Sequence, residues 1–191
     1  MFVIRGHDYI KTVLAQHAEK AFGSCSVVVE PNLGHIEDGA RDILRGNLDS
    51  LARGYFIIRN FNGLQSECYF DVRVFSPTCE SNKNMSMADN FSKMEKIKNK
   101  DYAERIKHML GGNFIPCIFS SGGGIGPAAR KVIKDLATKA SSSSLEKFED
   151  MKKGLKLDII FAFLKSRIEG LRSCRNNIAT QSQMLNLFHG D

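Results

Sequence analysis

The feature that most constrains the fold is an apolar run of nine residues, Glu67 to Phe75, that contains a charged pair. Its β-branched and aromatic residues predict a strand, and Pro77 ends it. Asp71 and Arg73 are two residues apart, so they share one face of this strand. A carboxylate and a guanidinium inside an apolar strand indicate either a structural ion pair or a functional site.

Hydrophobic periodicity predicts the remaining elements. Apolar residues recur at helical spacing in four segments: Asp8 to Phe22, Met87 to Leu110, Ala128 to Ala140, and Leu145 to about Ile178. Short apolar runs predict further strands at 26–29, within 48–59 and at 113–120, and the Asn and Gly residues of 60–65 predict a hairpin. We expect an α/β fold, a central mixed β-sheet with flanking helices in the order αβββαβα, plus C-terminal helices.

The length of 191 residues fits one domain. We expect a core over 1–140 and a helical extension over 145–178 that packs on the same domain, with Gly154 as a possible break between two helices. One broad apolar face marks that extension: Leu155, Ile159, Ile160, Phe163, Leu164, Ile168 and Leu171. The polar tail, 179–191, is expected to be flexible.

Charge and cysteine content narrow the class of protein. A net charge of +6 favours polyanions such as nucleic acid or an acidic membrane surface. The five cysteines include no C-x-x-C pair, which predicts reduced thiols in an intracellular compartment. No stretch approaches the ~20 apolar residues that cross a bilayer, so we expect no membrane partner.

A metal site is the functional interpretation of Asp71, because Mg²⁺ or Mn²⁺ binds hard oxygen ligands. Asp49 opens the preceding strand, and a hairpin would bring it beside Asp71. Glu30, before Pro31, is the candidate for a third ligand, although a surface glutamate before a turn is the commoner interpretation. An ion pair of Asp71 with Arg73 remains the structural alternative.

The lysine-rich helix offers cations for phosphate. Lys100 is expected to point over the sheet and stabilise charge during hydrolysis, with Tyr102 beside it, whereas a solvated helix face is the alternative. Backbone N–H groups of the turn 122–126 would contact a phosphate or simply form a tight turn. This turn lacks the Gly-Lys-Ser/Thr ending of a P-loop, so we expect no nucleotide or other small-molecule cofactor. The predicted nucleic-acid contacts are Lys96, Lys98, Tyr102, Arg105, Gly123 and Gly124.

Several motifs together resemble a domain at the C-terminal end of reverse-transcriptase polyproteins of animal retroelements. The resemblance covers most of the chain and rests on segments 30–33, 48–55, 69–77, 98–102, 114–116, 121–124 and 164–175. The Asp, Asp-x-Arg and Lys-x-x-x-Tyr pattern also resembles the restriction-like endonucleases of the PD-(D/E)XK superfamily, whose αβββαβ core agrees with the expected order. The resemblance implies that Asp49 and Asp71 bind the metal and that Lys100 is a catalytic lysine placed on the neighbouring helix.

These observations lead to two hypotheses. The first is an Mg²⁺-dependent endonuclease-like domain, intracellular and nuclear, that hydrolyses DNA phosphodiester bonds with Asp49, Asp71, Arg73 and Lys100. DNA is its expected partner, with RNA as the alternative. The second is a catalytically inactive nucleic-acid-binding or protein-interaction domain of a decayed or domesticated retroelement. Arg73 stands where the superfamily usually has lysine and cannot lose a proton to activate water, which keeps the second hypothesis open. Neither hypothesis fixes the oligomeric state.

Overall fold

A computed structural model describes residues 2–29 and 55–188. Its elements are α1 (Phe2–Phe22), a short 3₁₀ turn η1 (Ser24–Ser26), β1 (Val27–Val29), β2 (Tyr55–Arg59), β3 (Glu67–Phe75), α3 (Met87–Leu110), β4 (Asn113–Ser120), α4 (Pro127–Ser142) and α5 (Phe148–Phe188). The chain is therefore an α/β protein, as expected. None of the helices in these ranges is both long and apolar enough to span a membrane.

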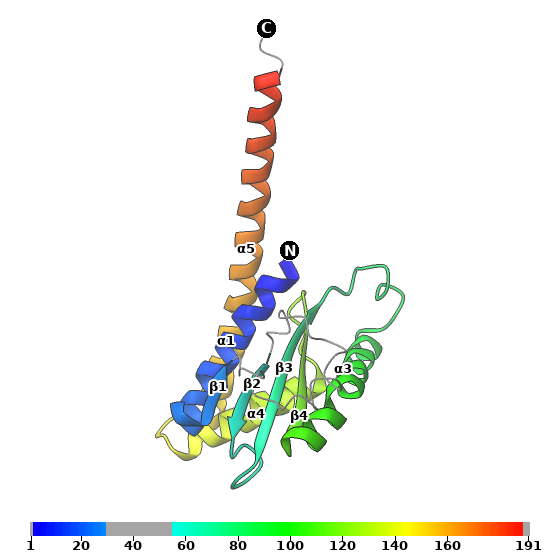
Figure 1. Ribbon diagram of the computed structural model, residues 1–191. Helices are drawn as coiled ribbons and strands as arrows, with labels where there is room; N and C mark the ends of the chain where they lie inside the picture. Colours follow the sequence, from blue (N-terminus) through cyan, green and yellow to red (C-terminus); the bar gives the residue numbers. More distant parts are fainter. Residues whose placement is uncertain (1, 30–54, 189–191) are drawn as a thin grey trace.

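The four described strands form one mixed sheet in the order β1-β2-β3-β4 (Figure 1). β1 pairs antiparallel with β2, and β2 pairs antiparallel with β3 through the predicted hairpin. β4 pairs parallel with β3, with α3 as the crossover between them. A parallel pair requires such a crossover, and the lysine-rich helix α3 lies against the sheet, chiefly over β4.

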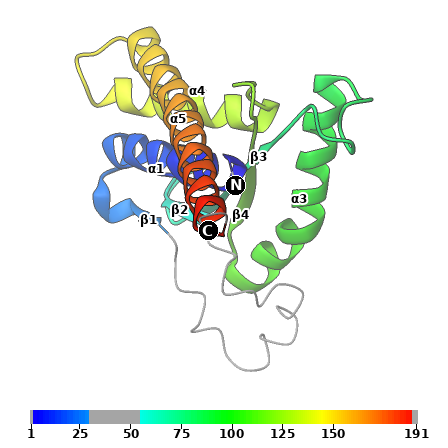
Figure 2. The same cartoon turned by 90° about the horizontal axis from the view of Figure 1, so that it is seen from above.

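Each face of the sheet has its own helical layer, as Figure 2 shows. Even-numbered residues of β3, such as Phe70 and Val72, join the core formed with α1, α4 and α5. Odd-numbered ones turn to α3, where Phe75 packs with Phe91 and Tyr69 packs with Ile106. This alternation follows from the period of two in a strand, and it assigns Asp71 to the α3 face.

Local signals account for the ends of α3. The Ser86 hydroxyl accepts a hydrogen bond from the Asp89 N–H at the start of the helix. At the other end Gly111 takes a left-handed conformation, with φ of 64°, which glycine adopts without strain. The ranges predicted for β3, α3 and β4 agree with the structure.

The C-terminal region differs from its prediction. α5 is one continuous helix through Gly154, so the predicted helical pair is wrong, and it extends to Phe188 instead of ending near Ile178. The predicted broad apolar face is in fact divided between two faces. Leu155, Ile159 and Phe163 are buried, whereas the other four predicted members are exposed: Ile160, Leu164, Ile168 and Leu171.

Candidate active site

Asp71 lies in the middle of β3, between two paired strands. Its backbone is in register with Tyr55 of β2 and Pro116 of β4. The residue is only 4% exposed. Burial of an ionised carboxylate is costly unless a cation or hydrogen bonds compensate for the lost hydration, so its surroundings have to supply a partner.

That partner is Lys98 of α3. Its Nζ lies 2.6 Å from Oδ2 of Asp71, and its side chain is 17% exposed. The same ammonium lies 4.9 Å from the ring centroid of Tyr102, one turn further along the helix, and the Tyr102 ring contacts Phe114 of β4. Lys98 is thus held between a carboxylate and an aromatic face.

Burial makes Asp71 a weaker acid than usual. Desolvation is the largest influence and raises its pKa. Lys98 opposes this most strongly, and His7 and Arg73 add smaller lowering effects. The net direction is upward, which means that the ion pair only partly compensates for the burial of the carboxylate.

Arg73 extends the site along the same face of β3. It is half-buried and near enough for its charge to act on the Asp71 carboxylate. Within 2–29 and 55–188 its guanidinium makes no hydrogen bond or ion pair. The predicted structural ion pair between Asp71 and Arg73 is therefore not formed, and the Arg73 guanidinium is free to bind an anion.

No protein-family model, no curated protein and no solved structure matches this chain. The case for its function therefore rests on the geometry around Asp71.

The lysine that reaches the sheet is Lys98, whereas Lys96 and Lys100 are exposed. The prediction that Lys100 points over the sheet is therefore corrected. Successive helical residues are rotated by about 100°, so a shift of two positions turns a side chain to nearly the opposite side. For Arg105 the structure describes the helical backbone alone.

The glycine turn after β4 uses its own N–H groups. Gly123 N–H donates to the Ser120 carbonyl, and Gly124 N–H donates to the Ser120 hydroxyl. At the start of α4 the Ala128 N–H donates to the Glu95 carboxylate at 3.0 Å. The tight-turn interpretation fits these contacts, and the predicted phosphate contacts at Gly123 and Gly124 are not supported.

The other predicted metal ligands, Asp49 and Glu30, lie outside the described residues. Among the described residues, no group of three or more His, Cys, Asp or Glu side chains is placed to bind a metal. Asp71 Oδ2 is buried and accepts no hydrogen bond of regular geometry, and the cation that it contacts in the structure is Lys98 Nζ at 2.6 Å.

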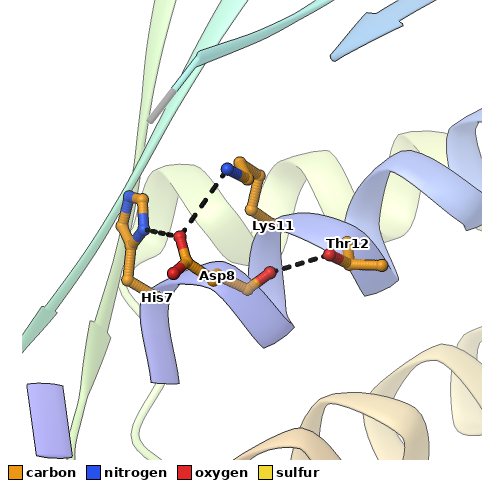
Figure 3. Close-up of polar contacts among 4 residues, drawn as sticks. All are labelled: His7, Asp8, Lys11 and Thr12. Atoms are coloured by element: carbon orange, nitrogen blue, oxygen red, sulfur yellow. Dashed lines mark hydrogen bonds and ion pairs between the residues drawn. The ribbon is translucent and has the colours of Figure 1, made fainter. Parts of the chain in front are cut away.

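Two polar residues of α1 were not predicted from the sequence as candidate site residues. His7 and Lys11 converge on the Asp8 carboxylate, as Figure 3 shows, with nitrogen–oxygen distances of 3.1 and 3.6 Å. The backbone carbonyl of Asp8 also accepts a hydrogen bond from Thr12. His7 acts on the pKa of Asp71, and Lys11 is 4% exposed. The helical spacing could have indicated that Lys11 is buried, because it precedes the buried Ala15 by one turn and so lies on the same face of α1.

Proposed function

We propose that this chain is a metal-dependent endonuclease-like domain that hydrolyses DNA phosphodiester bonds. The observation that carries the proposal is the buried Asp71 paired with Lys98 of the crossover helix, with the free guanidinium of Arg73 on the same face. The element order and the parallel β3–β4 pair further support a restriction-endonuclease-like core of the retroelement type. DNA is the proposed partner and the nucleus the proposed compartment.

Each described side chain has a separate role in this proposal. The Asp71 carboxylate would hold Mg²⁺ or Mn²⁺ together with Asp49. The metal, when bound, supplies an acidified water as nucleophile. Lys98 offers a positive charge beside the carboxylate, suited to an oxygen that becomes more negative during hydrolysis. Arg73 binds and orients a phosphate, because its planar guanidinium can make two hydrogen bonds to one anion.

The direct test is nicking of supercoiled plasmid with magnesium, manganese or EDTA. We expect metal-dependent nicking by the unmodified chain and only the EDTA background with Asp71→Asn. Asp101→Asn, an exposed aspartate on α3, is the matched control and should nick normally. Undiminished nicking by a folded Asp71→Asn variant would exclude Asp71 as a metal ligand.

A pair of lysine variants tests whether Lys98 or Lys100 is the catalytic lysine. We expect Lys98→Met to lower the nicking rate by about 10² or more, the range for loss of a group that stabilises developing charge. Lys100→Met removes an equal charge from the exposed side of α3 and should change the rate by less than about threefold. The opposite ranking would restore Lys100 as the catalytic lysine.

A non-catalytic nucleic-acid-binding domain is the second candidate. It is favoured by Arg73, whose guanidinium suits phosphate but cannot transfer a proton, and by Lys96 and Lys100, which are exposed on α3. Retention of DNA or RNA in a gel shift, with a steep salt dependence and no metal-dependent product, would identify this function.

A further inference from the structure

Helix α5 carries a second apolar face that nothing in the described chain covers. Its buried face holds Leu155, Ile159, Ala162 and Phe163 against the domain. The other face presents six large apolar side chains that are each 43 to 63% exposed: Leu157, Ile160, Phe161, Leu164, Ile168 and Leu171. We refer to these six as the α5 stripe. In Figure 1 this helix extends well beyond the sheet.

The spacing of the α5 stripe is that of a helix–helix seam. Leu157, Phe161, Leu164, Ile168 and Leu171 are separated by four, three, four and three residues. That alternation is the heptad pattern of a coiled coil. Six half-exposed side chains make an apolar patch on the order of 500 Å², as large as the largest patches of typical monomers, which are often functional.

Flanking charges discriminate between possible orientations of two such helices. In a parallel pair, Arg167 of one helix faces Arg172 of the other, and these like charges offset any attraction between Lys153 and Asp158. The Arg167 guanidinium also donates to the Ser121 carbonyl of its own chain at 2.8 Å. In an antiparallel pair with Phe161 of one helix packed beside Leu164 of the other, Asp158 of each helix faces Lys165 of the other. Both of these residues are exposed in the structure. Within one chain Asp158 contacts His17 at 2.7 Å and the Lys165 ammonium lies 4.6 Å from the Tyr9 ring centroid, so each would exchange a contact with α1 for one across the seam.

We propose that the α5 stripe binds a second copy of this chain, the two α5 helices pairing antiparallel in a symmetric dimer. Two stripes together remove on the order of 1,000 Å² of apolar surface from water, about the minimum for a specific interface. The twofold arrangement repeats each Asp158–Lys165 contact, so the seam is self-complementary. This dimer does not involve the Asp71 site and does not depend on its activity.

Sedimentation velocity over a range of protein concentrations tests the dimer. We expect the unmodified chain to dimerise reversibly and Phe161→Glu to raise the dissociation constant by more than about tenfold, because each dimer loses two buried aromatic contacts. Leu145→Glu is the matched control, since Leu145 is a fully exposed leucine before α5 and outside the stripe. A chain that stays monomeric at high micromolar concentration overturns the proposal, as does equal dimerisation by the Phe161→Glu and Leu145→Glu variants.

Charge exchange tests the orientation. Asp158→Lys and Lys165→Asp should each weaken self-association by about fivefold, because each sets like charges opposite one another twice. An equimolar mixture of the two variants should regain dimers, because every contact then joins opposite charges. Circular dichroism spectra of both variants, compared with that of the unmodified chain, check that they are folded. Dimers that are unaffected by either variant, or a mixture that is no stronger than its components, overturn the antiparallel arrangement.

Discussion

Replacement of Lys98 by Met should lower the free energy of unfolding, because it leaves the buried Asp71 carboxylate without its cation. The substitution keeps roughly the length of the side chain but removes the cation, which lies 2.6 Å from Asp71 Oδ2 and 4.9 Å from the Tyr102 ring centroid. Removal of one partner of a buried ion pair typically costs 3–5 kcal/mol, because the remaining charge is left without compensation. Since Lys98 retains some exposure, we expect the low end, about 3 kcal/mol at neutral pH. Lys100→Met should change the free energy of unfolding by less than about 0.5 kcal/mol.

The pH dependence separates this mechanism from a general packing defect. The pKa of Asp71 is raised above its ordinary value of 3.8, so the folded state binds the proton more tightly than the unfolded state. This contribution to stability is fully present below 3.8 and is lost as the pH rises through the folded-state pKa. Lys98 is the strongest influence that lowers the pKa of Asp71, so its loss raises that pKa further and widens the pH range between the unfolded-state and folded-state pKa values. The cost of Lys98→Met should therefore be small near pH 4 and approach about 3 kcal/mol near pH 7.

Urea unfolding followed by far-ultraviolet circular dichroism measures both effects, and the chain contains no tryptophan to report by fluorescence. The double variant Asp71→Asn/Lys98→Met should recover much of the loss, because the buried charge has been removed as well. A cost of Lys98→Met that is below about 1 kcal/mol near pH 7, or that does not change with pH, would refute the proposed energetics.

Two further predictions concern the surroundings of the site. Glu95→Ala should lower the free energy of unfolding by about 1 kcal/mol, because the Ala128 N–H at the start of α4 loses its acceptor. Urea unfolding measures this loss, with Glu104→Ala, at an exposed glutamate of α3, as the control, and an equal loss in both variants would contradict the prediction. Burial, aided by the hydrogen bond to Glu67, raises the pKa of Tyr69 to about 12. In an ultraviolet titration one tyrosine should therefore ionise near pH 12, and the stability that this shift contributes should be lost as the pH rises from 10.0 to about 12. Glu67→Gln should move this pKa toward the ordinary value of 10.0, and no movement would assign the whole shift to burial.

Much of the fold was predictable because its signals are local. The apolar run with Pro77 behind it located β3, and the Asn and Gly residues after β2 located the hairpin. Gly111 marked the end of α3 because only glycine adopts a left-handed conformation there without strain. The pattern also identified Asp71 as the unusual residue of its strand. A charge inside an apolar run is anomalous whatever the rest of the chain does.

Contacts between elements were not predictable in the same way. Lys98 and Lys100 are equivalent in a list of lysines, and only the rotation of α3 against the sheet selects Lys98 as the partner of Asp71. The sequence of the glycine turn is suited to phosphate binding, but in the structure its N–H groups have other acceptors. Gly124 donates to the Ser120 hydroxyl, and Ala128, at the start of α4, donates to Glu95 of α3.

The apolar residues of α5 illustrate the same limit. Their spacing determined a helix, but packing against α1 and α4 decided which side was buried and left Leu164 exposed. Sequence by itself thus determined which described segments are helices and which are strands, apart from the short turn η1, together with the strand that carries Asp71 and the residue classes available to a site. Tertiary structure decided which cation meets Asp71, which N–H groups are already used and which apolar face remains open, because those choices depend on how rigid elements are rotated against one another.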